Sequence, residues 1–184
     1  STSLERAAEE GNLIAQYELA LQHISVGRTS EGITMLRGAA DRGFAMAQYR
    51  LAKLYEGGEG VPVDLTNARQ WTESAAANGN RRAMHDLGVY FARGEGGREV
   101  DEVAAARWFR QAAELGVADS QYNLGVLYQQ GRGVDANPNE ALFWFLVAAR
   151  QGDQDAAARA AELETDRTQA QVEQARTRAQ AFQP

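Results

Sequence analysis

The sequence predicts an all-α protein, built as an α-solenoid of helix–turn–helix repeats. Three observations lead to this fold class. Alanine is frequent and proline occurs only three times in 184 residues, a composition that favours helices. An Ala-Ala pair recurs along the chain, each time with a glycine three residues after it. A second signature, centred on a leucine, lies between successive pairs.

The Ala-Ala pair marks the second helix of each repeat. The pairs are Ala7-Ala8, Ala39-Ala40, Ala75-Ala76, Ala112-Ala113 and Ala148-Ala149, with spacings of 32, 36, 37 and 36 residues. A tryptophan stands four residues before each of the last three pairs (Trp71, Trp108, Trp144), and Met35 takes that place in the first full repeat. Such tryptophans could form a platform for stacking bases or sugars. Their fixed place before the pair favours packing between repeats instead.

The leucine signature marks the first helix of each repeat. Its leucines are Leu19, Leu51, Leu87 and Leu124, and an aromatic residue follows the last three after four residues, at Tyr55, Phe91 and Tyr128. Positions i and i+4 share one helical face, and the small residue after each leucine lets a neighbouring helix approach closely. Glycine-rich turns then end these helices, and Asp64, Asp101 or Asn137 is expected to cap the next helix.

One such repeat cannot bury its own apolar face, so repeats must stack on one another. We therefore expect a single solenoid domain over residues 1–184. It would comprise an N-terminal half unit (1–11), four repeats (12–43, 44–79, 80–116 and 117–152) and C-terminal capping helices (153–184). In the tail, Val172, Ala175, Ala179 and Phe182 recur at helical spacing and predict a closing helix. The alternative is a frayed tail.

This pattern resembles the Sel1-like repeat family, relatives of the tetratricopeptide repeats. Residues 47–79 and 120–152 follow the family pattern closely. The first repeat departs from it with the short turn Ser25-Val26-Gly27-Arg28, and the third carries one extra residue near Gly96-Gly97-Arg98. The resemblance implies a right-handed α-solenoid that binds proteins on its concave face.

Two further segments, 83–87 and 119–125, together with the alanine-rich end, resemble the Sel1-like part of PodJ-type polar localisation factors. That resemblance implies a periplasmic segment of a membrane-anchored scaffold at a bacterial cell pole. Residues 1–6 lack the pattern of a signal peptide, and we expect the chain to be part of a larger protein. No apolar run is long enough to span a bilayer. The alternative location is cytoplasmic.

Little in the sequence indicates chemistry. The net charge of −6 argues against nucleic-acid binding, and the absence of cysteine removes thiolate metal sites. The two histidines, His23 and His85, lie in no metal motif, and His85 and Asp86 diverge because they are adjacent on a helix. The Gly-x-Gly turns lack the Gly-Lys-Ser/Thr ending of a phosphate loop. No catalytic residue, metal or cofactor is expected.

A partner could bind along the first helices. In tetratricopeptide arrays the residue two before the signature leucine tends to face the concave groove, and here it is Tyr17, Tyr49, His85 or Tyr122. Lys53 and Arg82 occupy flanking positions. These six residues form the predicted protein-binding site, because aromatic anchors with a polar rim suit protein recognition. In the alternative reading, the tyrosines pack against the following helix and expose only their hydroxyls.

We therefore expect a non-enzymatic scaffold with a protein partner. The alternative is a module that binds peptidoglycan or another glycan fragment through the tyrosines.

Overall fold

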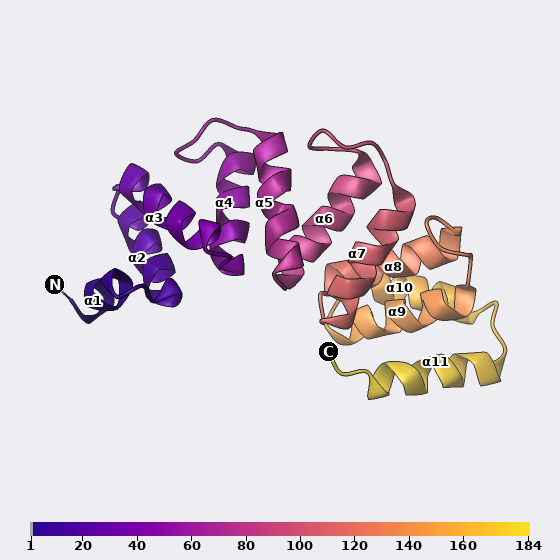
Figure 1. The fold of residues 1–184 in the computed structure, drawn as a ribbon. Coiled ribbons are helices and arrows are strands. Elements are labelled where there is room, and N and C mark those ends of the chain that lie inside the picture. The colour runs from indigo at the N-terminus through magenta and orange to yellow at the C-terminus, as the bar shows by residue number, and fades with distance from the viewer. Residues whose placement is uncertain (1) are drawn as a thin grey trace. The chain divides into compact units, whose positions relative to one another are not determined.

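The computed structural model describes residues 2–184, which fold into eleven α-helices joined by turns (Figure 1). Their bounds are α1 Ser3–Glu9, α2 Leu13–Ser25, α3 Thr29–Asp41, α4 Ala45–Gly57, α5 Leu65–Ala77, α6 Arg81–Arg93, α7 Glu102–Glu114, α8 Ala118–Gln130, α9 Pro138–Arg150, α10 Gln154–Glu164 and α11 Gln169–Ala181. These residues contain no strand. None of the helices within this range is long and apolar enough to cross a membrane.

The helices alternate between two kinds. The even-numbered helices α2, α4, α6 and α8 carry the leucine signature, and α1, α3, α5, α7 and α9 carry the Ala-Ala pair. Consecutive helices pack on each other, as α2 does on α3, α4 on α5, and α8 on α9. The predicted all-α helical repeat fold is confirmed.

The chain forms two compact units. Among the described residues, the N-terminal unit comprises 2–87 and 95–98, and the C-terminal unit comprises 88–94 and 99–184. The core of the N-terminal unit is built around Leu36, Leu51 and Leu54, which are at most 2% exposed. The core of the C-terminal unit is built around Leu124, Leu142 and Phe145, which are fully buried.

The helix ends form as the sequence predicts. Gly58 and Gly131 end α4 and α8 in the left-handed conformation, with φ of 69° and 66°. Asp64, Asp101 and Asn137 are the N-cap residues of α5, α7 and α9, and each side chain accepts a hydrogen bond from the backbone N–H three residues later. These bonds satisfy N–H groups that the helix itself leaves unpaired.

The glycine after the signature leucine admits an aromatic ring from the next helix. A Cβ added to Gly88 would lie 2.7 Å from the ring of Phe109, and one added to Gly125 would lie 2.8 Å from the ring of Phe145. Because real Cβ atoms do not approach other atoms this closely, larger residues here would push the helices apart. The close approach predicted for a small residue is confirmed at these two positions.

The tryptophans pack rather than form an open platform. Trp144 is 4% exposed and contacts the ring of Phe143, with centroids 4.9 Å apart. Trp71 is half-buried against the core of the N-terminal unit, and Trp108 is half-buried in the C-terminal unit. This arrangement favours the packing interpretation over a stacking site.

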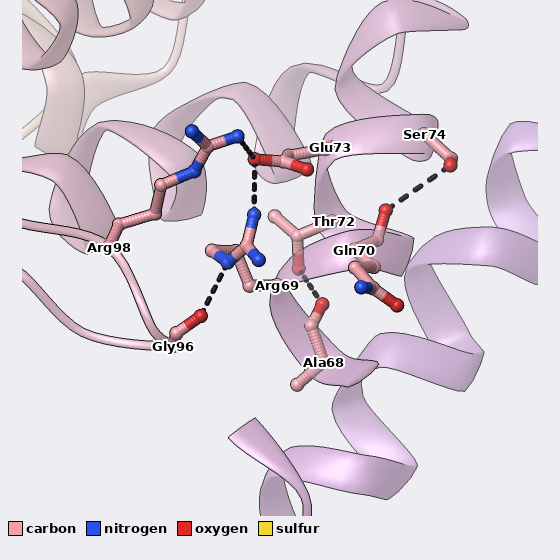
Figure 2. A network of polar contacts seen from close by, with 8 residues as sticks. All are labelled: Ala68, Arg69, Gln70, Thr72, Glu73, Ser74, Gly96 and Arg98. Atoms are coloured by element: carbon pink, nitrogen blue, oxygen red, sulfur yellow. Dashed lines mark hydrogen bonds and ion pairs between the residues drawn. The ribbon is translucent and has the colours of Figure 1, made fainter. Parts of the chain in front are cut away.

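The turn with the extra residue is held by arginines (Figure 2). Arg69 on α5 donates to the carbonyl oxygen of Gly96 and to Glu73, 2.7 Å from its Oε1. Arg98 donates to the same oxygen of Glu73 at 3.0 Å. A Cβ on Gly96 would lie 2.8 Å from that of Arg69, so the turn lies directly against α5.

The tail forms two helices. The side chain of Thr168 caps α11 in a capping box with Gln171. Ala175 and Ala179 of α11 are buried, and Phe182 after it packs edge-on against Trp144, with ring centroids 5.6 Å apart. These contacts place α11 against α9 and cover the apolar side of the last Ala-Ala helix.

Candidate partner-binding face

We give the name first-helix face to a set of side chains at corresponding positions of the first helices in the N-terminal unit. It consists of Ile14 and Tyr17 on α2, Met46, Tyr49 and Lys53 on α4, and Arg82 and His85 on α6. Within each helix these residues are three or four positions apart, so they share one side of it. Ile14 is 59% exposed and Met46 is 50% exposed, which is high for large apolar side chains.

Tyr17 anchors one end of this face. Its ring packs edge-on against Phe44, the N-cap residue of α4, with ring centroids 5.7 Å apart at 76°. The Tyr17 side chain is half-buried, so it packs against the following helix and also leaves part of its surface open to a partner. The neighbouring Ile14 adds exposed apolar surface on the same side of α2.

Tyr49, Lys53 and Asp86 form a polar cluster between α4 and α6. The Nζ of Lys53 lies 2.8 Å from Oδ2 of Asp86 and 5.5 Å from the centroid of the Tyr49 ring. Burial raises the pKa of the Tyr49 hydroxyl, and the negative charge of Asp86 raises it further. Burial alone would lower the pKa of Lys53, but the hydrogen bond and charge of Asp86 outweigh it and raise the pKa. Both groups therefore keep their protons at neutral pH.

Arg82 and His85 continue the face on α6. Arg82 is exposed, and its positive charge acts on Tyr49, opposing the effect of Asp86 on the pKa of Tyr49. His85 is half-buried. The structure thus brings Tyr49, Lys53 and Arg82 together, with Tyr17 and His85 on the neighbouring helices of the same unit.

Tyr122 belongs to the C-terminal unit and is described there. Its ring packs against Phe145 of α9, with centroids 5.6 Å apart, and the guanidinium of Arg159 on α10 lies 5.6 Å from its centroid. Arg159 also donates to Gln129 at 3.2 Å. A cation over a ring face is favourable, so Arg159 fixes the orientation of this tyrosine.

Two of these partners do not follow from the sequence motifs. Asp86 stands beside His85 in the sequence, whereas in the structure it pairs across helices with Lys53. Arg159 lies on α10, a helix that lacks the leucine signature, so no repeat alignment points to it. In both cases the missing information is which residues of successive helices face each other.

The face combines exposed apolar groups, tyrosine rings and fixed charges. This composition suits the burial of partner side chains, with hydrogen bonds and ion pairs at the edge. Within residues 2–184, no group of three or more His, Asp or Glu side chains is arranged to hold a metal ion.

A sequence model of the Sel1 repeat matches residues 45–80, 81–117 and 118–153, which is more than half of the chain. The chain is also 45% identical over 84 residues to "Localization factor PodJL" of Caulobacter vibrioides strains. That match covers 45% of this chain and 8% of the PodJL protein.

Solved structures of repeat proteins are similar to the structure of this chain. A Sel1 repeat protein from Oxalobacter formigenes is 30% identical with a TM-score of 0.71, over 77% of this chain and 58% of its own. A protective antigen of uropathogenic Escherichia coli with an SLR fold is 28% identical with a TM-score of 0.64, over 97% of this chain and 47% of its own. The chain therefore spans about half the length of each of these structures.

Proposed function

Because the chain belongs to the Sel1 repeat family, we propose that it is a non-enzymatic scaffold that binds a protein partner through the first-helix face. Repeat arrays offer extended surfaces in which each repeat contributes a few side chains, and that is suited to holding a partner protein. Tyr122 would provide the corresponding contact on the C-terminal unit.

The observation that carries this proposal is the pairing of exposed apolar groups with half-buried tyrosines. Ile14 precedes Tyr17 by three residues, and Met46 precedes Tyr49 by three residues, so the same pattern occurs on two successive first helices. The Lys53–Asp86 ion pair and Arg82 border this apolar surface. Protein interfaces are enriched in aromatic residues and Met and have a polar rim, and tyrosine is common among their hot spots.

We also propose that the scaffold serves a bacterial cell-pole factor and lies in its periplasmic part. The 45% identity over 84 residues to a polar localisation factor supports this role. A β-lactamase fused to this segment within its parent protein would confer resistance only if the segment is exported. A resistant fusion, with a fluorescent parent protein at one pole, is the expected result. A sensitive fusion would indicate the cytoplasmic alternative.

Alanine substitution of three face residues tests the scaffold proposal. We expect the Tyr49→Ala, His85→Ala, Tyr122→Ala triple variant to lose proteins that the unchanged chain captures from a periplasmic extract. The matched control is the Gln70→Ala, Arg107→Ala, Gln111→Ala variant, which changes exposed residues of second helices. Circular dichroism should show that both variants remain helical.

The same variants distinguish the two binding functions. If the triple variant no longer binds isolated peptidoglycan fragments but still captures protein, the result would contradict the scaffold proposal and favour a glycan-binding module. Equal capture by the triple variant and its control would contradict a role for these three residues in binding.

A further inference from the structure

A hollow lies between α1, α2 and α3 in the N-terminal unit, away from the first-helix face. Its volume is about 370 Å³, within the range of about 300–1,000 Å³ that is usual for ligand pockets. The residues around it are Glu5, Ala8, Glu9, Gln16, Leu19, Met35 and Gly38. Gln16 and Leu19 lie on the opposite side of α2 from Ile14 and Tyr17, so both surfaces could be occupied at once.

Two residues beside the hollow are smaller than those at the same positions of the later repeats. Met35 stands where the other repeats have Trp71, Trp108 and Trp144. Gly38 stands where they have Ser74, Gln111 and Val147. A Cβ added to Gly38 would meet no atom within 4 Å, so this side of the hollow is unfilled.

The walls of the hollow are fixed by hydrogen bonds. Gln16 on α2 donates to the carbonyl oxygen of Ala8 at 3.1 Å, which ties α1 to α2. Glu5 accepts from the backbone N–H of Thr2 at 2.9 Å in the capping box of α1. A partner therefore meets a preformed site, which reduces the entropy lost on binding.

The lining indicates what kind of group would fit. Ala8, Leu19 and Met35 are apolar, and a methionine sulfur makes favourable contacts with aromatic rings. Glu5 and Glu9 lie four residues apart on the same side of α1, and no basic residue lines the hollow. An apolar floor beside two carboxylates complements an aromatic ring that is followed or preceded by a positive charge.

We propose that this hollow is a second binding site, which takes an aromatic side chain of a protein partner carried next to a lysine or arginine. The aromatic ring lies against Ala8, Leu19 and Met35, and the cation lies near Glu9. This site does not depend on the first-helix face.

Methionine methyl resonances provide a direct test. The three methionines report on three environments, since Met35 lines the hollow, Met46 lies on the first-helix face and Met84 is buried. The probe is the peptide acetyl-Lys-Trp-Lys-amide, added to the full chain labelled with ¹³C at its methionine methyls. We expect the Met35 resonance to shift in a saturable way, while the Met46 resonance stays in place.

Two control peptides test the proposed chemistry. Acetyl-Lys-Ala-Lys-amide and acetyl-Glu-Trp-Glu-amide should each bind at least about tenfold more weakly, because one lacks the ring and the other reverses the charge. Equal binding of either control would overturn the proposal. So would a probe that shifts Met46 alone, which would place binding on the first-helix face, or a probe that shifts no methionine.

Variants locate the site. Gly38→Gln adds a long side chain at the edge of the hollow, where a Cβ would meet no atom within 4 Å, so it should obstruct the hollow, keep the fold and abolish the shift of Met35. Glu9→Gln on α1 should weaken binding several-fold. Glu18→Gln removes the same charge from an exposed position on α2, outside the hollow, and should leave binding unchanged. Unchanged binding by Gly38→Gln would overturn the proposal.

Discussion

At the scale of single residues, Asp86 organises the polar part of the first-helix face. It holds Lys53 at 2.8 Å and raises the pKa of Tyr49, so one carboxylate controls two groups on a neighbouring helix. Because Lys53 is about one-third exposed, solvent reduces the strength of the pair, and its main effect is to fix side-chain positions.

Removal of this carboxylate should therefore change titration behaviour. We predict that Asp86→Asn lowers the pKa of the Tyr49 hydroxyl and of the Lys53 amine, measured by NMR titration at alkaline pH. Both pKa values are raised in the native chain, so the associated stability is present below their ordinary values near 10 and is lost as pH rises through the raised ones. As pH rises through that range, Asp86→Asn should lose less stability than the unchanged chain. An unchanged Tyr49 titration would contradict the role given to Asp86.

A buried glutamine joins successive repeats. The Nε2 of Gln121 donates to the carbonyl oxygen of Ala113 at 3.1 Å, and its Oε1 accepts from Gln151 at 2.8 Å. Gln48 repeats the first of these bonds, to Ala40 at 3.0 Å. This glutamine lies one residue before the signature tyrosine. The sequence did not predict its role, because a polar residue is normally expected to be exposed.

We predict that Gln121→Ala destabilises the protein by about 2 kcal/mol, since it removes two hydrogen bonds and leaves a cavity at a fully buried position. Gln121→Met should cost less, because Met84 fills the same position in α6 and restores the volume. Urea denaturation measures both variants. An alanine variant as stable as the unchanged chain would contradict a structural role for Gln121.

At the scale of helices and turns, local chemistry made most elements predictable. The caps at Asp64, Asp101 and Asn137 depend only on residues three positions apart, and all three formed as expected. Contacts between helices were less predictable. Arg37 and Arg110 each donate to the hydroxyl of a tyrosine 18 residues later, a pairing that depends on how two helices pack.

The turn after α8 offers a sharp test at this scale. Gly133 has φ of 70°, and a Cβ there would lie 2.0 Å from the carbonyl oxygen of Glu102 on α7. We predict that Gly133→Ala destabilises the protein by about 2 kcal/mol or more, through backbone strain and displacement of the turn. Gly27→Ala, at φ of 86° with no atom near its Cβ, provides the matched control and should cost less. Thermal unfolding compares the two, and equal losses would contradict the packing contribution.

At the scale of the whole molecule, the repeated signatures predicted the fold, and the first repeat, which departs from them, lines the hollow that we propose as a second binding site. The all-α repeat class followed from the sequence because the signature recurs four times. The predicted repeat boundaries and the predicted binding residues remain predictions. The hollow beside Met35 did not follow from the sequence, since it requires knowledge of how α1 lies against α2 and α3.

Restoring the missing tryptophan should stabilise the N-terminal unit. We predict that Met35→Trp fills the hollow, buries apolar surface against Leu19 and raises stability by about 1–2 kcal/mol, observed as a higher melting temperature. Met46→Trp is the control, because it adds the same side chain at a position that is 50% exposed. A lower melting temperature for Met35→Trp would show that the hollow cannot hold an indole ring.

The central claim is that a protein partner binds the first-helix face, and site-specific photo-crosslinking in cells that express the parent protein tests it most directly. A photoreactive amino acid would replace Met46 on this face or, as a control, the exposed Gln70 on a second helix. We predict a discrete protein crosslink from position 46 that disappears in the Tyr49→Ala, His85→Ala, Tyr122→Ala background, and none from position 70. A protein crosslink from position 70 with none from position 46 would contradict the claim.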